Sequence, residues 1–249
     1  MESQRLHTVD RTMQVLFLLA EHLALTVKEV AAHLEMPPST SYRYLSSLKS
    51  SGMVWERQDS KYTLGPRSVQ LETAFRKCFE RSSYHPIMRD IAQQTGETVA
   101  LLVPVDKVAV CIDTIESARH LRYTFSKGVA KPMLRGASAK AMLPFLPPEW
   151  VEQLIDSSGD LCEDEKGALR NEMPVIREQG YAVSYGEVDE GVWAVGAPVF
   201  KLNGALEASL SVIGPGFRIR GAEEKLIQLT LVAARRMSNI EGWELDDVV

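Results

Sequence analysis

The spacing of apolar residues predicts three short helices in the first part of this chain. Apolar residues recur there every three or four positions, which is the period of a helix packed on one face. They are Met13, Leu16, Phe17 and Ala20 in one stretch, Val27, Val30, Ala31 and Leu34 in the next, and Leu45 and Leu48 in a third. We expect the three inner faces to share one small core.

The second and third stretches are bounded by residues that begin and end helices. Thr26 can cap the second helix, and Glu29, three residues on, completes a capping box. Pro37 and Pro38 end that helix because proline cannot continue it, while Pro38 suits the first turn of the next helix. Gly52 is placed to end the third helix. Two helices joined by so tight a turn predict a helix-turn-helix.

A predicted hairpin follows the two helices. Residues 53–57 and 61–64 are strand-like, and the triplet Gln58-Asp59-Ser60 between them is turn-like. A hairpin in this place gives the order of a winged helix-turn-helix, which binds DNA. The alternative is a helix pair that serves packing alone, but turn, hairpin and charge pattern would then coincide by accident.

The outer face of the third helix carries groups that suit a phosphate backbone. From Met36 to Trp55 the chain has two basic residues, six serines and no carboxylate. Hydroxyls and helix N-termini bind phosphate, whereas arginine can bind a guanine edge through two hydrogen bonds. We therefore expect Arg43 to read a base and Lys49 to neutralise a phosphate. The predicted DNA contacts are Thr26, Ser39, Thr40, Ser41, Tyr42, Arg43, Ser46, Lys49, Arg57 and Lys61.

The remainder of the chain reads as mixed α and β. The strand-like runs are residues 97–105, 107–115, 121–129, 181–188, 192–200 and 205–212, and the helical patterns are 136–146 and 163–179. Residues 201–204 form a hairpin connection, with Gly204 where a positive φ is needed. Runs of strands with helices between and after them predict an antiparallel sheet with helices on its faces.

Length and charge are compatible with two domains. The chain has 249 residues, enough for one large domain or two ordinary ones. Residues 1–85 hold 11 Lys and Arg against 9 Asp and Glu, whereas the rest holds 17 against 24. Because the whole chain is acidic, with a net charge of −5, any contact with DNA must be local and oriented.

Other functional classes find little support in the sequence. Cys78, Cys111 and Cys162 form no CxxC pair and are odd in number, which predicts reduced thiols. No histidine pair has metal-ligand spacing, and no phosphate-binding glycine loop, GxSxG elbow or Cys-His nucleophile pair occurs. We therefore expect no catalytic residue, no metal and no cofactor. No apolar run could cross a bilayer and no signal precedes the first helix, so we expect a cytoplasmic protein.

A series of short motifs spans nearly the whole chain. In the N-terminal part they are Leu25-Thr26, Val30-Ala31, Leu34, Ser39-Thr40 with Arg43 and Leu45, Gly52, and residues 62–67. In the C-terminal part they are residues 95–99, 176–182, 197–200 with Gly204, and 209–215. In their joint order and spacing they resemble the IclR family of bacterial transcription regulators.

The resemblance implies an α+β architecture with a function for each part. It implies a winged helix-turn-helix in residues 1–67, a linker helix in 68–85, and a GAF-like antiparallel-sheet domain for effector binding and oligomerisation in 86–249. The implied partners are double-stranded DNA with a pseudo-palindromic operator, a small organic acid as effector, and further copies of the chain in a homodimer or tetramer. No membrane partner is expected.

The stretch from Leu134 to Lys140 is the candidate effector site. Small residues at a helix start leave backbone N–H groups open, the helix dipole favours an anion there, and Arg135 offers a fork that matches a carboxylate. An ordinary helix N-terminus with an exposed arginine gives the same pattern. The resemblance favours the ligand site, since family members place the corresponding loop at the ligand.

Further pocket positions follow from the same resemblance. Family members that bind very small polar acids have an acidic residue, a cysteine and two serines where this chain has Ser184, Ala194, Ser211 and Ile213. Ala194 and Ile213 replace polar groups with apolar wall, which favours an acid with an aromatic or aliphatic part over glyoxylate or pyruvate. A core role is the alternative for Trp193 and Ile213. The predicted effector contacts are Met133, Arg135, Gly136, Ala137, Ser138, Ser184, Trp193, Ala194, Ser211 and Ile213.

Two function classes are compatible with these features. One is a ligand-responsive DNA-binding regulator, which we expect to control a catabolic operon. The other is a small-molecule sensor or enzyme whose N-terminal helices serve only assembly. The missing catalytic constellation argues against the enzyme and the predicted wing argues against pure assembly, so we predict the regulator.

Overall fold

The computed structural model describes residues 2–80 and 84–240, with side chains described from residue 8 to 77 and from 84 to 240. The predicted thiol of Cys78 therefore lies outside the described residues. The chain divides into two compact units, Met1–Phe79 and Glu80–Val249.

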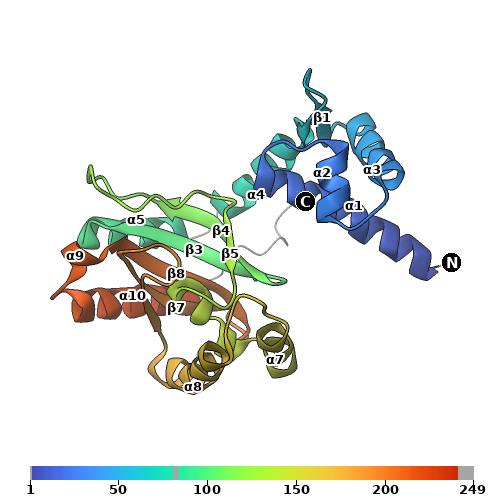
Figure 1. Cartoon of the computed structure of the whole chain (residues 1–249). Coiled ribbons are helices and arrows are strands. Elements are labelled where there is room, and N and C mark those ends of the chain that lie inside the picture. Colours follow the sequence, from blue (N-terminus) through green and yellow to red (C-terminus); the bar gives the residue numbers. More distant parts are fainter. Residues whose placement is uncertain (1, 81–83, 241–249) are drawn as a thin grey trace. The chain divides into compact units, whose positions relative to one another are not determined.

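The first unit has the order of a winged helix-turn-helix (Figure 1). Its elements are α1 (Glu2–His22), α2 (Val27–His33), α3 (Pro38–Ser50), β1 (Val54–Glu56), β2 (Tyr62–Leu64) and α4 (Arg67–Glu80). Thr26 caps α2 as predicted, because its hydroxyl accepts a hydrogen bond from the Glu29 N–H at 3.3 Å while the Glu29 carboxylate accepts one from the Thr26 N–H at 2.7 Å. β1 and β2 pair antiparallel as the wing.

The core of the first unit differs from the prediction at α1. Leu16 is buried as expected, but Met13 and Phe17 are 41% and 58% exposed and Ala20 is also exposed. The inner face of α1 is made by Val15, Leu16, Leu18 and Leu19. Residues 13–20 hold more apolar side chains than one helix face can bury, so apolar spacing alone does not decide which of them turn inward.

The second unit is built on one antiparallel sheet, as predicted, and this sheet has six strands. In spatial order its strands are β5 (Ala130–Pro132), β4 (Val108–Ile115), β3 (Thr98–Val105), β8 (Leu206–Pro215), β7 (Val192–Phe200) and β6 (Ala182–Tyr185). The predicted strand over residues 121–129 is wrong. That segment is irregular, and the described hydrogen bond of its Tyr123 carbonyl comes from the side chain of Thr98 rather than from a neighbouring strand.

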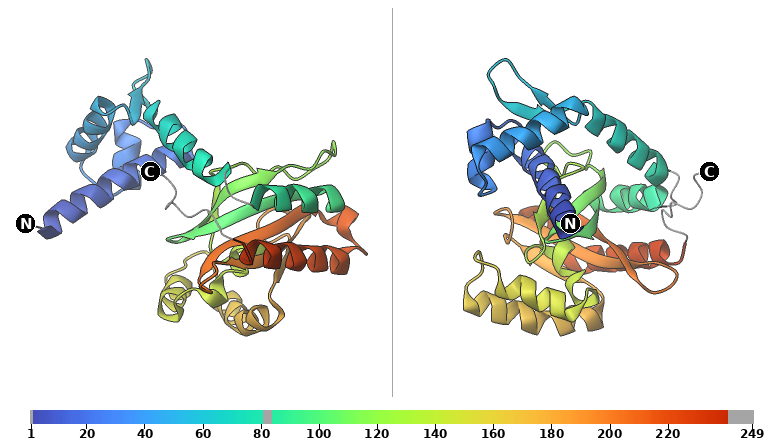
Figure 2. Two further views of the ribbon diagram at one scale, coloured as in Figure 1. Left: turned by 180° about the vertical axis from the view of Figure 1, so that it is seen from behind. Right: turned by 90° about the vertical axis from the view of Figure 1, so that its right-hand side faces the viewer.

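Helices cover both faces of this sheet (Figure 2). They are α5 (Tyr84–Thr95), α6 (Ala137–Lys140), the 3₁₀ turn η1 (Leu143–Phe145), α7 (Pro148–Asp156), α8 (Glu163–Gln179), α9 (Gly216–Ile219) and α10 (Glu223–Ser238). α5 and α10 contact each other and the sheet, while α6 packs on the sheet with α7 and α8 beyond it. The helix predicted over 163–179 is α8. The one predicted over 136–146 is broken into α6 and η1, because Pro144 lacks the N–H that would continue it.

The α6 side of the sheet carries the core that shapes the candidate effector site. Small and medium side chains from the central strands, among them Ala100, Leu102 and Ile213, pack there with Ala137 of α6 and Leu154 of α7. Alternate strand residues point to the opposite face, toward α5 and α10. No helix among the described residues is long and apolar enough to span a membrane.

Candidate nucleic-acid interface and effector cavity

The outer face of α3 presents polar side chains that have no partner in the described part of the chain. Ser39, Thr40, Tyr42, Arg43 and Ser46 make no side-chain hydrogen bond or ion pair within the described residues. All are exposed except Thr40, which is half-buried. Open hydroxyls and an open guanidinium are the groups that phosphates and base edges bind.

Ser41 is the exception among the predicted contacts of α3. Its side chain is buried, and its hydroxyl donates to the Pro37 carbonyl oxygen at 3.3 Å. It lies four residues before Leu45, which is also fully buried, so it extends the inner stripe of the helix. The placement of Ser41 on the outer face is therefore wrong.

Lys49 already has a carboxylate partner inside the domain. Its ammonium lies 2.5 Å from the Glu56 carboxylate of β1. This hydrogen bond raises the pKa of Lys49 and lowers that of Glu56. Arg57 pairs more loosely with Asp59 at 3.5 Å. The segment from Met36 to Trp55 has no carboxylate, but the next residue, Glu56, places its carboxylate against Lys49 of α3.

A narrow cavity of about 50 Å³ lies on the α6 side of the sheet. Seven of the predicted effector residues line it: Arg135, Gly136, Ala137, Ser138, Ser184, Ala194 and Ile213. Ala139, from the predicted stretch 134–140, lines it as well. The other lining residues come from loops and strands that the sequence did not indicate: Leu102, Tyr123, Phe125, Lys131, Glu187, Val188, Asp189 and Val192.

Three predicted effector residues do not line this cavity. Trp193 precedes Ala194 on β7 and so points to the other face of the sheet, since successive strand residues alternate. Met133 is buried in the core beside the cavity. Ser211 is buried beneath α6, and its hydroxyl has no hydrogen-bond partner within the described residues.

The backbone N–H groups at the start of α6 are not open, contrary to the prediction. The Gly136 N–H donates to the Glu187 carboxylate at 2.9 Å, and the Ala137 N–H donates to the Ser184 hydroxyl at 3.0 Å. Arg135 is also engaged, because its guanidinium donates to the Asp160 carbonyl oxygen at 3.0 Å and to the Glu165 carboxylate at 3.1 Å. Acceptors from distant segments of the chain thus bind the N–H groups and the guanidinium, which the local sequence alone would leave unpaired.

Lys140 is a buried cation held by two carboxylates. Its side chain is 6% exposed, and its ammonium donates to both oxygens of Glu172 at 2.9 and 3.0 Å and to Glu187 at 2.7 Å. Glu187 therefore bridges the N–H of Gly136 and the ammonium of Lys140. The pairing with carboxylates compensates for the burial of the charge.

Tyr123 and Asp189 form a second polar contact at the cavity. The Tyr123 hydroxyl donates to Asp189 at 2.5 Å, and the Lys131 ammonium lies 3.6 Å from the same carboxylate. Burial, followed by the adjacent carboxylate, raises the pKa of the Tyr123 phenol. Glu187 and Asp189 both belong to the hairpin loop 186–191, whose two bounding glycines and three acidic residues were the signal available in the sequence.

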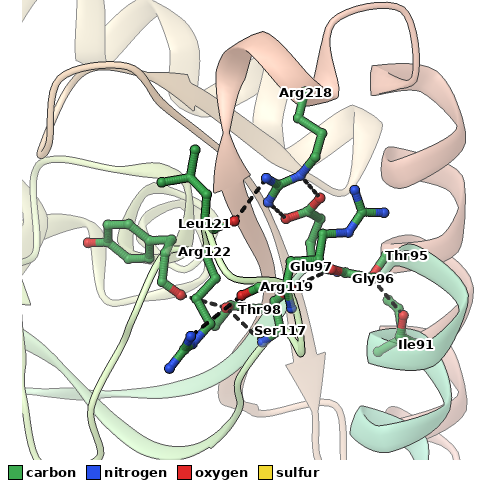
Figure 3. A network of polar contacts seen from close by, with 11 residues as sticks. Ile91, Thr95, Gly96, Glu97, Thr98, Ser117, Arg119, Leu121, Arg122 and Arg218 are labelled. Carbon is green, nitrogen blue, oxygen red and sulfur yellow. Dashed lines mark hydrogen bonds and ion pairs between the residues drawn. The ribbon is translucent and has the colours of Figure 1, made fainter.

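A polar network fixes the irregular segment that carries Tyr123 (Figure 3). The Arg218 guanidinium donates two hydrogen bonds to the Glu97 carboxylate, at 2.6 and 2.5 Å. Its third nitrogen donates to the Leu121 carbonyl oxygen at 2.9 Å. The hydrogen bond to Glu97 raises the pKa of Arg218. The Thr98 hydroxyl donates to the Tyr123 carbonyl oxygen at 2.6 Å. Two residues of the motif at 95–99 thus hold one wall of the cavity.

The cysteine and metal-ligating side chains of the described residues form no cluster for nucleophilic or metal chemistry. Burial, with a smaller effect of the Asp113 charge, raises the pKa of the Cys111 thiol to about 12, so this thiol is not nucleophilic near neutral pH. Cys162 is exposed and free. Among the described residues, no group of three or more His, Cys, Asp or Glu side chains could hold a metal ion.

Comparison with known proteins places both units in one family. Residues 80–239 match the family model described as bacterial transcriptional regulator IclR C-terminal, and residues 8–58 match the IclR helix-turn-helix domain. The chain is 29% identical over 231 residues to the HTH-type transcriptional regulator KipR of Bacillus subtilis, covering 90% of this chain and 91% of that protein. It is 27% identical over 247 residues to the HTH-type transcriptional regulator BhcR of Paracoccus denitrificans, covering 95% and 88%.

A solved structure shows the same fold. The crystal structure of a putative IclR transcriptional regulator from Silicibacter sp. TM1040 superposes with a TM-score of 0.80 at 20% identity, covering 94% of this chain and 97% of that one. The chain belongs to the IclR family of bacterial transcription regulators, and it is a DNA-binding regulator of the IclR type.

Proposed function

We propose that this regulator controls a catabolic operon in response to a small organic acid with an aromatic or aliphatic body. The cavity beside α6 receives the acid. In this proposal residues 1–67 bind DNA, residues 68–85 connect the domains, and residues 86–249 bind the effector and assemble the chain into a homodimer or tetramer in the cytoplasm.

The observation that carries the proposal is the two-sided lining of the cavity. One side is apolar, with Leu102, Phe125 and Ile213 among its residues. The other side holds the Gly136 N–H and the cations Lys131 and Arg135, each of which now pairs with a carboxylate of the protein. An apolar wall binds an apolar body, and N–H groups and cations bind a carboxylate.

The DNA arm of the proposal rests on the open face of α3. A symmetric dimer places two such helices on a pseudo-palindromic operator, with half-sites about 34 Å apart or at a multiple of that spacing. The acid acts by binding one of two arrangements of the dimer more tightly, a difference of typically ~1 to 3 kcal/mol.

Calorimetry against a panel of acids tests the effector class. Aromatic and longer aliphatic acids, such as benzoate and hexanoate, should bind more tightly than glyoxylate and pyruvate. Ile213→Ser should reverse the order because it adds a hydroxyl to the apolar wall. Val175→Ser on the exposed face of α8 is the matched control and should leave the order unchanged. Binding of the short acids alone would contradict the proposal.

A further inference from the structure

The carboxylate of Glu187, a residue that lines the cavity, is held by two donors of the protein. One oxygen of its carboxylate accepts the Gly136 N–H at 2.9 Å, and the other accepts the Lys140 ammonium at 2.7 Å. This is a complete carboxylate site, and the carboxylate in it belongs to the protein. The cavity beside it has a volume of about 50 Å³, so an acid gains room there when the Glu187 side chain moves away.

A second carboxylate cannot share this site with Glu187. Lys140 already faces Glu172 as well as Glu187, so the local charge is negative before any acid enters. Two carboxylates in contact repel each other unless one takes up a proton. An incoming acid must therefore either bind elsewhere in the cavity or displace Glu187.

The structure allows Glu187 to leave at little cost to the fold. Lys140 keeps both oxygens of Glu172, so its buried ammonium does not become unpaired. Glu187 is partly exposed and lies on the hairpin loop between β6 and β7, where the Gly186 N–H bond to the Val192 carbonyl closes the loop independently of the side chain. Rotation of the side chain is sufficient, and no strand has to unpair.

We propose that Glu187 is a tethered carboxylate that the effector must displace, so that this residue sets the acid concentration at which the regulator responds. The proposal rests on the proposed function of the cavity as an effector site. It assigns Glu187 a role in affinity and threshold, and it implies that the effector carboxylate binds the Gly136 N–H and Lys140 after the exchange.

The test removes the tethered carboxylate and offers a free one. Glu187→Ala deletes the two carbons that acetate restores, so sodium acetate is the probe, compared with sodium chloride at equal ionic strength by NMR titration and thermal melting of the full chain. We expect the variant to bind acetate about tenfold more tightly than the parent protein, within the usual range of such couplings. Glu190→Ala removes the same charge from an exposed position of the same loop and should bind acetate as the parent does.

Two further measurements keep the result interpretable. Glu187→Gln keeps an acceptor for the Gly136 N–H but loses the charge, so it should fold even where the alanine variant does not and should bind benzoate more tightly than the parent. Equal affinity of the parent and both Glu187 variants for these acids would overturn the tethered carboxylate. Release of operator DNA is measured separately: tighter acid binding without any effect on DNA would support the exchange at Glu187 and contradict the proposed regulation.

Discussion

The outer face of α3 and the cavity beside α6 satisfy their polar groups in opposite ways. On the outer face of α3, Arg43 and the hydroxyls of Tyr42 and Ser46 have no hydrogen-bond or ion-pair partner within the described residues. In the cavity, each charged lining residue has an ion pair or hydrogen bond inside the protein, as in Lys131 with Asp189 and Arg135 with Glu165. DNA can therefore bind α3 by simple addition, whereas a ligand of the cavity must exchange with existing partners.

This difference predicts how substitutions in the two regions behave. Removal of an unpartnered surface group costs binding and leaves folding stability nearly unchanged. Removal of a group from a satisfied buried network leaves its partner unpaired and costs stability first.

Glu97→Gln should be the most destabilising change. It leaves the largely buried Arg218 guanidinium without its carboxylate, and breaking such a pair costs on the order of 3 kcal/mol. Urea unfolding of the C-terminal unit measures the loss. Glu116→Gln breaks the exposed pair with Arg122 and should cost roughly 0 to 1 kcal/mol. An equal loss in the free energy of unfolding for the two variants would contradict the role of the Glu97 network in supporting the cavity wall.

Gly196→Ala should push α6 away from β7. The added Cβ would lie 2.5 Å from the Ala137 carbonyl oxygen, a backbone atom that cannot rotate aside. Overpacking of this kind costs about 1 to 3 kcal/mol and should also weaken acid binding. Gly167→Ala within α8 meets no atom within 4 Å and should instead stabilise the helix by about 0.5 to 1 kcal/mol. Thermal melting should therefore shift in opposite directions for the two variants.

Arg43→Ala should cost about 1 to 3 kcal/mol of operator affinity and relax base preference at one position. Its effect on the free energy of unfolding should stay within about 0.5 kcal/mol. Fluorescence anisotropy on operator and random DNA separates the contributions. An equal loss on both DNAs would contradict base reading by Arg43 and leave it as a phosphate contact.

Glu56→Gln should strengthen DNA binding by freeing Lys49. The ammonium is paired with Glu56 at 2.5 Å, so Lys49→Ala alone should change affinity little. Glu56→Gln should instead make the negative slope of log affinity against log salt steeper by about 0.9. Glu35→Gln removes an exposed charge of the same unit that has no ion pair or hydrogen bond within the described residues, and it controls for the general effect of charge. A full unit of slope lost in Lys49→Ala, with Glu56→Gln silent, would show that the pair opens on DNA unaided.

Glu29 should give the smallest effect, visible as acid sensitivity of the N-terminal unit. Hydrogen bonds from the Thr26 N–H and hydroxyl hold the pKa of Glu29 below its ordinary value of 4.5. A depressed folded-state pKa stabilises the fold above the unfolded-state pKa, and this contribution disappears as pH falls through the folded-state value. Glu29→Gln should therefore flatten the dependence of stability on pH below about 4.5. An unchanged pH profile would contradict this role of the capping box.

The sequence contained much of the fold because local signals there agree with tertiary structure. The capping box at Thr26, the wing and the span of α8 were all predictable from turn chemistry and periodicity. Ser41 was wrongly assigned to the outer face because a serine at an inner position of α3 looks no different in sequence from its outer neighbours. Met13 and Phe17 were wrongly assigned to the core because residues 13–20 of α1 include more apolar residues than its inner face can hold.

The cavity was less predictable because its partners come from distant segments. The sequence placed Gly136 at a helix start, but nothing local shows that Glu187, 51 residues away, accepts its N–H. Tyr123 was assigned to a strand, and its segment is held instead by Arg218 and Thr98. Long-range pairing of this kind depends on the register of the sheet, which periodicity alone does not fix.

In the proposed function, an acid in the cavity controls the binding of DNA by the open face of α3. The most direct test is a salt titration of binding to the DNA upstream of the protein's own gene, with and without a pool of aromatic and aliphatic acids. We predict saturable binding that weakens steeply with salt and responds to one acid of the pool. Binding at the level of random DNA under every condition, or operator binding that no acid changes, would contradict the claim.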